Sequence, residues 1–197
     1  LYIEIKEKNA SFCFNDPIFQ PIPVISAKRK ITRLKKLNTG KENNADKEYE
    51  DLASQLLTSF LYPKLDFATE QSRTESGALI RDLIFFNNRS YNFLSDIYDI
   101  YSSRQIVMEL KNVKEINGEH INQLNRYLKD EFGKFGIIVT RNRIPKSIFR
   151  NTIDLWSGQR RCIIVIDDHD METMYELYET KQRHPIDVIK KKYIEFS

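Results

Sequence analysis

The sequence is poor in the features that mark several classes of protein. Its two cysteines, Cys13 and Cys162, stand far apart and match no metal-binding or redox spacing, so we predict a reducing, cytoplasmic setting. No apolar run approaches the roughly 18 residues of a membrane span, and no charged and then apolar leader precedes a cleavage site. The sequence also contains no internal repeat and no low-complexity tract. These absences predict a soluble protein that does not act on membranes.

Charge and length are ordinary. The 197 residues carry a formal net charge of +3, which permits a polyanionic partner but does not demand one. A chain of this length can bury a sizeable core. It begins at Leu1, without an initiator methionine, in a run that alternates like a strand. We therefore expect a fragment of a longer polypeptide, acting as a homo-oligomer or within a larger multidomain protein or complex.

Residues 1–46 are predicted to form a β-strand and linker appendage, the end of an upstream region, before a main domain at residues 47–197. Proline at positions 21 and 23 argues against helix there. The run from Ala27 to Lys36 is basic with sparse apolar residues and precedes a polar stretch, which is the composition of a linker. A solvated connector is the more common meaning of such a run. The alternative is that it contacts nucleic-acid phosphates.

From residue 47 the pattern changes to that of a helix. Glu50 stands close to the predicted helix start, beside an apolar stripe at helical spacing. An acid in the first turn is stabilised by the helix dipole, so Glu50 is either a terminal charge or a site residue. The stripe comprises Tyr49, Leu52, Ala53, Leu56, Leu57 and Phe60.

Two apolar strands that each carry an acid follow this helix. The strand at 78–86 places Asp82 on the face of its apolar neighbours, where a lone aspartate is costly unless a base or a metal compensates it. The strand at 106–111 places Val107, Glu109 and Lys111 on one face, because strand side chains alternate. Glu109 paired with Lys111 on a solvated edge strand is one interpretation of this stretch, and a buried functional pair is the other.

A helix pattern opens downstream at Gly118, where Gln123 and Tyr127 stand four residues apart and hence on one helical face. A further strand follows at 135–141. This set of elements resembles the PD-(D/E)XK nuclease superfamily. It consists of a helix that carries a glutamate, a strand that carries an aspartate, a strand with a Glu-x-Lys motif and a helix with a Gln-x-x-x-Tyr motif. The order helix, three strands, helix and strand resembles the common core of that fold, and the opening at Tyr49 resembles Mrr-type restriction enzymes.

This resemblance covers residues 47–141 and has two departures. Arg81 stands where some members have the proline of the family name, and a predicted helix at 91–101 lengthens the interval after the Asp strand. The proline is dispensable to the chemistry, whereas the insertion leaves open whether the right aspartate has been aligned. Asp66 and Glu75 are the fallback carboxylates.

The resemblance implies an α/β fold with a restriction-endonuclease-like core, a central mixed β-sheet flanked by helices. It also implies a metal-dependent nuclease. Hydrolysis of a phosphodiester needs charge stabilisation and an activated water, and Mg²⁺ on hard oxygen ligands supplies both, with Mn²⁺ as a substitute. In that picture Asp82 and Glu109 bind the metal. Glu50 contributes directly or through water, and the backbone carbonyl of Leu110 completes the shell.

The resemblance assigns three further residues to the site. Lys111 would position the water, help to deprotonate it, or offset charge at the phosphate. Gln123 and Tyr127 would hold Lys111, the water or a substrate phosphate. The function it implies is an endonuclease acting on double-stranded DNA in prokaryotic restriction or antiviral defence. An RNase of the same fold is one alternative. The other is a catalytically silent module for nucleic-acid binding or assembly.

Three other groups of residues permit two interpretations each. The acids at 167–170 follow a strand and are expected to cap a helix rather than to bind metal. His120 shares a helical face with Gln123, although a solvated histidine is the commoner case. A basic sector with interleaved aromatic residues either grips a nucleic-acid backbone or belongs partly to the core. It comprises Arg141, Arg143, Arg150, Arg160 and Arg161 with Phe149 and Trp156.

Overall fold

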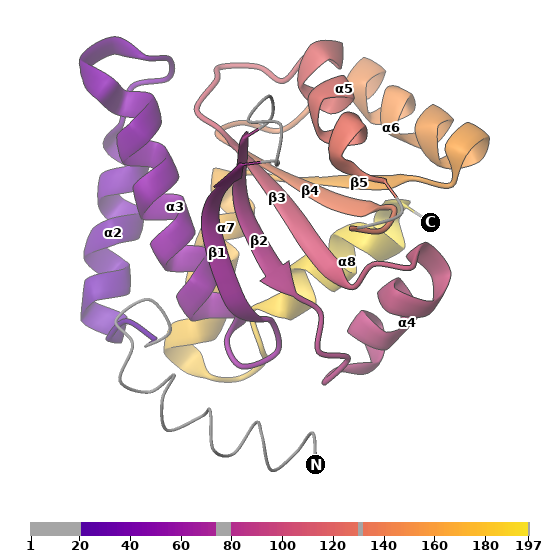
Figure 1. The fold of residues 1–197 in the computed structure, drawn as a ribbon. Helices are drawn as coiled ribbons and strands as arrows, with labels where there is room; N and C mark the ends of the chain where they lie inside the picture. The colour runs from indigo at the N-terminus through magenta and orange to yellow at the C-terminus, as the bar shows by residue number, and fades with distance from the viewer. Residues whose placement is uncertain (1–20, 74–79, 130–131, 197) are drawn as a thin grey trace.

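The computed structural model describes residues 21–73, 80–129 and 132–196, and at 67–73 and 80–82 it describes the backbone alone. The chain forms layers, with a β-sheet between two groups of helices (Figure 1). The strands are β1 (Asp66–Arg73), β2 (Ile80–Phe86), β3 (Gln105–Lys111), β4 (Phe135–Thr140) and β5 (Cys162–Ile166). The helices are α2 (Val24–Lys36), the short 3-10 helix η1 (Glu42–Asn44), α3 (Ala45–Leu61), α4 (Asn92–Tyr101), α5 (Gly118–Tyr127), α6 (Lys146–Gln159), α7 (Asp168–Thr180) and α8 (Ile186–Phe196).

The sheet is mixed and keeps the order of the sequence, β1-β2-β3-β4-β5. β1, β2 and β3 pair antiparallel, whereas β3, β4 and β5 pair parallel through the crossover helices α5 and α6. This arrangement confirms the predicted α/β class, a central mixed sheet flanked by helices. Because β3, β4 and β5 are parallel, the segments that follow Lys111, Thr140 and Ile166 all leave the sheet at one edge.

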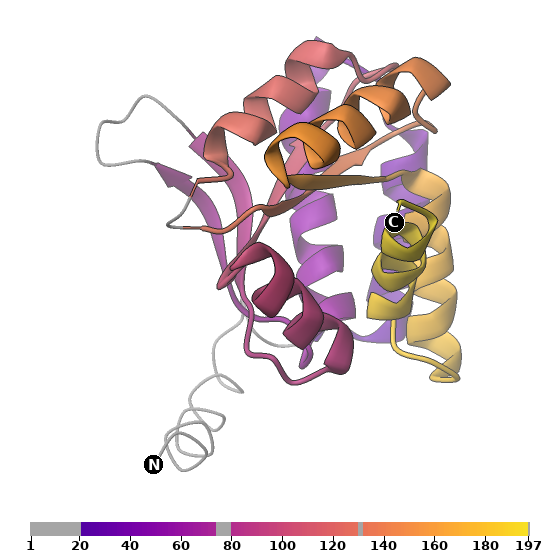
Figure 2. The same cartoon turned by 90° about the vertical axis from the view of Figure 1, so that its right-hand side faces the viewer.

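Side chains of β3 alternate between two hydrophobic cores. Ile106, Met108 and Leu110 belong to a large core beneath α2, α3, α4, α7 and α8, whereas Val107 belongs to a smaller core beneath α5 and α6. Figure 2 shows the orange helix α6 and the yellow helix α8 on opposite sides of β5. All five residues from Ile106 to Leu110 are buried. β3 is therefore a central strand, and its interpretation as a solvated edge strand was wrong.

The N-terminal part of the described chain differs from the prediction. The basic run expected to be a linker forms helix α2, and its buried residues Ala27, Ile31 and Leu34 pack into the large core. These residues recur at intervals of four and three, which puts them on one face of a helix. Pro23 precedes the helix as its N-cap, a place where a missing backbone N–H costs nothing. The linker interpretation was wrong for residues 24–36, and the domain division at residue 46 stays a prediction.

Smaller differences concern the length of elements. Strand β1, which precedes the strand of Asp82, runs for eight residues and ends at Arg73. Helix α6 occupies the region interpreted only as a basic sector. The strand-like run at 1–5 lies outside the described residues. Within the part of the chain that the structure describes, no helix is both long and apolar enough to cross a membrane.

Candidate active site

The carboxylate of Glu109 lies at the centre of the candidate site. Its side chain is 1% exposed, in a strand that is covered on both faces. Its Oε1 accepts a hydrogen bond from Lys111 Nζ at 2.7 Å and another from Gln123 Nε2 at 2.6 Å. The structure thus brings together three of the predicted site residues, from β3 and α5. A buried carboxylate of this kind requires an opposite charge and hydrogen-bond donors, because its desolvation costs several kcal/mol.

Lys111 is more exposed to solvent than the carboxylate with which it pairs. Its side chain is 18% exposed, compared with 1% for Glu109. It is the last residue of β3, where the strand leaves the core, and it pairs with Thr140 of β4. An ammonium group at this place is within reach of a ligand outside the protein while it neutralises the carboxylate inside.

Helix α5 positions Gln123 over the sheet. Asn117 begins the helix with a capping box, since its side chain accepts hydrogen bonds from the N–H groups of residues 119 and 120. Buried Ile121 and Leu124 then hold the helix against the sheet. Gly136 of β4 lets the helix approach closely, because a Cβ there would lie 3.0 Å from Leu128 and 3.1 Å from Leu124. This packing directs the polar side chain of Gln123 to the end of β3.

The backbone of Asp82 lies beside Glu109. In the β2–β3 ladder Ile84 pairs with Val107 and Leu83 pairs with Met108. The next antiparallel step in that register would bring the backbone of position 82 opposite Glu109. The strand placement predicted for Asp82 is therefore present, although its side chain lies outside the described part. Among the residues whose side chains are described, which do not include Asp82, no group of three or more metal-ligating side chains occurs.

The other predicted residues occupy different surroundings. Glu50 is half-buried on α3, a helix that covers the face of the sheet opposite to α5. Leu110 directs its side chain into the large core. Tyr127 is 2% exposed and packs in the smaller core. The fallback Asp66 pairs with Phe86 at the end of the sheet remote from Glu109, whereas the other fallback, at position 75, lies outside the described residues.

His120 lies at the border of the cluster. Its Nδ1 accepts a hydrogen bond from Asn117 N at 3.1 Å, so the ring completes the capping box of α5. Partial burial, together with the charge of Lys111, lowers the pKa of His120 below its ordinary value. The histidine is therefore neither fully solvated nor aimed at Glu109, and its observed contact is structural.

The acids that follow β5 cap a helix, as predicted. Asp167 accepts hydrogen bonds from the N–H groups of His169 and Asp170, which forms a capping box at the start of α7. Asp168 instead pairs with Arg141, Oδ2 to Nε at 2.8 Å. Arg141 is 8% exposed, so it belongs to the interior and not to a basic surface as the sequence suggested.

Sequence reasoning missed Asn112, the residue that directly follows Lys111. Its Nδ2 donates to the carbonyl oxygens of Asn38 and Gly40, each at 2.9 Å. Its Oδ1 accepts from Arg141 at 2.9 Å. Asn112 thereby fastens the loop after α2 to the end of β3. The signal available in the sequence was a single polar residue after the Glu-x-Lys motif, which is too common to identify such a contact.

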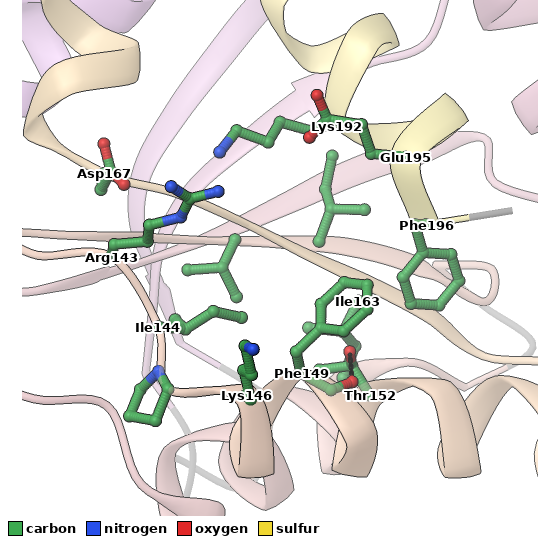
Figure 3. A pocket seen from close by; sticks show the side chains of 13 residues that line it. Arg143, Ile144, Lys146, Phe149, Thr152, Ile163, Asp167, Lys192, Glu195 and Phe196 are labelled. Carbon is green, nitrogen blue, oxygen red and sulfur yellow. Dashed lines mark hydrogen bonds between the residues drawn. The ribbon is translucent and has the colours of Figure 1, made fainter.

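A separate pocket of about 670 Å³ lies between α6, β5 and α8. Figure 3 shows its apolar side, with Phe149 and Phe196, and its charged side, with Arg143 and Lys192. Glu109, Lys111 and Gln123 do not line it. The candidate chemistry therefore lies in the polar cluster at the end of β3 and not in this pocket.

Comparison with known proteins finds a family model that matches part of the chain. Residues 83–151 match the model of the family described as the PD-(D/E)XK nuclease superfamily, which confirms the resemblance seen in the sequence. The matched segment begins one residue after Asp82 and contains the whole Glu109 cluster. Together with the mixed sheet, this match is consistent with a restriction-endonuclease-like fold. It indicates nuclease activity on nucleic acid, and nucleases of this superfamily generally use divalent metal ions.

A curated protein is similar to this chain over a short part of its own length. A stretch of 80 residues is 34% identical to part of an 80.3 kDa protein attributed to transposon gamma-delta in Escherichia coli (strain K12). This stretch is 40% of the present chain and 11% of that protein, so the chain spans only a small part of its relative's length.

Proposed function

We propose that this chain is a metal-dependent endonuclease that hydrolyses phosphodiester bonds of double-stranded DNA. The observation that carries the proposal is the buried carboxylate of Glu109 at the edge of a nuclease-like sheet. One of its oxygens accepts hydrogen bonds from both Lys111 and Gln123. A binding module has little use for a buried carboxylate beside a phosphate, because the two anions repel each other. A carboxylate held with a lysine is what a hydrolytic centre needs.

The donor set fits a hard divalent cation. Glu109 supplies a preorganised carboxylate, and Asp82 occupies the neighbouring strand position. Oxygen ligands of this type suit Mg²⁺, with Mn²⁺ as a substitute. Glu50, from the opposite helix layer, would bind directly or through water, and the carbonyl of Leu110 would complete the shell. When bound, the ion stabilises negative charge on the phosphate and lowers the pKa of water.

The protein's own residues supply orientation and charge. The Lys111 side chain is partly exposed and its Nζ contacts the buried carboxylate, so we infer that it offsets negative charge on a phosphate at that edge and orients a nucleophilic water there. Gln123 donates its amide hydrogen to Glu109 and so fixes the direction of the carboxylate before substrate arrives. Tyr127 contributes by holding α5 on the sheet through its buried ring.

Duplex DNA is the substrate we infer, with a role in prokaryotic restriction or antiviral defence in the cytoplasm. The transposon relative supports a setting in mobile DNA, although the similarity covers a small part of that protein. We further propose that the chain acts as a homo-oligomer or as part of a larger protein, since its relative is much longer. RNA is the rival substrate of the same chemistry.

A substrate panel tests this proposal. The purified chain is incubated with single- and double-stranded DNA and RNA of one sequence, each with Mg²⁺, with Mn²⁺ and with EDTA. We expect metal-dependent cleavage of duplex DNA that EDTA abolishes. Cleavage of RNA alone would show that the substrate is RNA and not DNA, while the proposed metal-dependent mechanism would still hold. Equal binding with and without metal, with no cleavage of any substrate, would show a binding module instead.

A further inference from the structure

The positive charge of the chain is concentrated on helix α2. Its 13 residues include six lysines or arginines and no acidic residue. The whole chain has a net charge of +3, so the rest of it sums to −3. A mildly basic protein thus consists of a mildly acidic body that carries one strongly basic helix.

The helix presents this charge outward. Ala27, Ile31 and Leu34 form its buried face, whereas Lys28, Arg29, Thr32, Arg33 and Lys36 line a depression on its outer side, next to the start of α3. Some cations of the helix have partners: Lys30 contacts Gln55, Arg33 pairs with Glu48, and Lys35 pairs with Glu172.

Three outward cations, Lys28, Arg29 and Lys36, form no ion pair with any residue in the described part of the chain. All three are exposed. They lie on one side of the helix within about 12 Å along its axis, at 1.5 Å per residue. Successive phosphates of one DNA strand are spaced closely enough for such a row to meet two or three of them.

The helix is fixed at both of its ends. Before its first turn, Ile22 N donates to Ser59 Oγ at 3.1 Å, and Tyr178 OH donates to the carbonyl of Ile22 at 2.6 Å. After its last turn, Asn112 donates to two carbonyl oxygens of the following loop. Because Asn112 directly follows Lys111, the C-terminal end of the basic helix is bonded to the same sheet edge as the candidate active site.

Arg141 strengthens this attachment. Its guanidinium donates to the carbonyl oxygens of Leu34, Lys35 and Leu37 at the end of α2, and also to Asn112. A cation at this helix terminus satisfies carbonyl groups that have no partner within the helix. The outward charges of α2 therefore have a fixed position relative to Lys111.

Neither the helix dipole nor a membrane surface accounts for the charge of α2. The dipole favours cations in the last turn, which fits Lys36 but not Lys28 and Arg29. Insertion into a membrane surface needs an exposed apolar face, whereas the apolar face of α2 is buried and Ile25 is its only exposed large apolar residue in the described structure. A polyanion that binds through charge alone fits the surface.

We propose that the outer face of α2 binds the phosphate backbone of the nucleic acid whose scissile phosphate lies at Lys111. This inference rests on the proposed function for its substrate class. The helix would add sequence-independent affinity and orient the duplex across the edge of the sheet. Each lost phosphate contact lowers the slope of log Kd against log salt by about 0.9 for duplex DNA.

The test measures binding without cleavage. Fluorescence anisotropy with a labelled 20-base-pair duplex in EDTA is recorded from 50 to 200 mM salt for the wild-type chain and for the triple variant Lys28→Ala, Arg29→Ala and Lys36→Ala. A control triple variant, Arg150→Ala, Arg183→Ala and Lys191→Ala, removes the same charge from exposed positions elsewhere. Circular dichroism melting confirms that both variants are folded.

We expect the α2 variant to weaken binding about tenfold or more at 100 mM salt and to lower the slope by about 2 to 3, with a change several times smaller in the control. Equal losses in the two variants would overturn the proposal, as would unchanged duplex binding with lost binding to vesicles of anionic phospholipid. Binding that depends on α2 in a chain that never cleaves would refute the proposed function alone. Cleavage without any dependence of binding on α2 would refute this inference alone.

Discussion

Two buried acid–base clusters lie at the same edge of the sheet, and their chemistry differs. At the end of β3, Glu109 pairs with Lys111, whose side chain is 18% exposed. After β4, Asp168 pairs with Arg141, whose side chain is 6% exposed. Arg141 makes five hydrogen bonds, including three to backbone carbonyl groups. Lys111 has three N–H donors and, among the described contacts, one hydrogen-bonded partner.

The difference separates a structural cluster from a functional one. Arg141 uses every donor of its guanidinium to join α2, β3 and α7, so it has none for a ligand. Lys111 keeps donor capacity at a place that solvent reaches. A base saturated by the protein stabilises the fold, whereas a base held by a single buried carboxylate remains able to bind an anion.

Replacement of the lysine has the largest effect that we expect on activity. Lys111→Ala removes the charge that faces the phosphate and should lower the rate of DNA cleavage on the order of 10³-fold. Lys114→Ala, three residues away and exposed, is the matched control and should cleave like the wild type. Initial rates on a supercoiled plasmid with Mg²⁺ measure both. Equal rates for the two variants would remove Lys111 from the mechanism.

Replacement of the arginine should act on stability. Arg141→Ala leaves Asp168 buried without its partner and should lower the free energy of unfolding by about 3–5 kcal/mol. Arg141→Lys should recover little, because an ammonium cannot reproduce the planar fork of donors. Urea denaturation of these variants and of the exposed control Arg143→Ala measures the effect. A stable Arg141→Ala protein would show that the cluster does not hold the fold together.

The amide of Gln123 should have an intermediate effect. Gln123→Ala removes a hydrogen bond to a buried charge, worth about 1.5–3 kcal/mol, so cleavage should slow about 10- to 100-fold. Asn122→Ala, exposed on the same helix, is the control and should have no effect. Rates are compared at saturating Mg²⁺. A slow Asn122→Ala protein would mean that the result reflects damage to α5.

The pH dependence of stability distinguishes the two clusters more finely. Burial raises the pKa of Asp168 to about 6, although Arg141 opposes this shift. The folded chain then binds a proton more tightly at this carboxyl than the unfolded chain does, so the stability contributed by this group falls as the pH rises from about 4 to 6. In the wild-type chain this loss of stability should be on the order of 2 kcal/mol, and in Asp168→Asn it should be absent. The free energy of unfolding of each protein is measured by urea denaturation from pH 4 to 7. If the two free energies depend on pH in the same way, the raised pKa of Asp168 is contradicted.

The sequence predicted the contact among the three residues at the centre of the candidate site. Alternation along β3 put Glu109 and Lys111 on one face, and the family resemblance placed Gln123 near them, where the structure has its hydrogen bond to Glu109. The site role predicted for Tyr127 stays a prediction. Although four residues separate it from Gln123, its ring turns into the core, because α5 packs its C-terminal half closely on the sheet.

Tertiary contacts explain what the sequence could not predict. Helix α2 has three buried apolar residues among six cations, so its pattern resembled a linker until packing on α3 and α7 revealed its buried face. The role of Arg141 depends on carbonyl groups more than 100 residues away in the sequence, at Leu34 and Leu37. No local pattern encodes a contact of that range.

The central claim is that the Glu109 carboxylate serves a metal-dependent hydrolytic site and is not merely a partner for Lys111. Cleavage of duplex DNA by wild type, Glu109→Ala, Glu109→Gln and Asp82→Ala, with Mg²⁺ and with EDTA, tests it most directly. We predict that all three variants stay folded and lose metal-dependent cleavage, with Glu109→Gln as inactive as Glu109→Ala although it keeps the shape of the side chain. Full activity in Glu109→Ala and Asp82→Ala would contradict this claim.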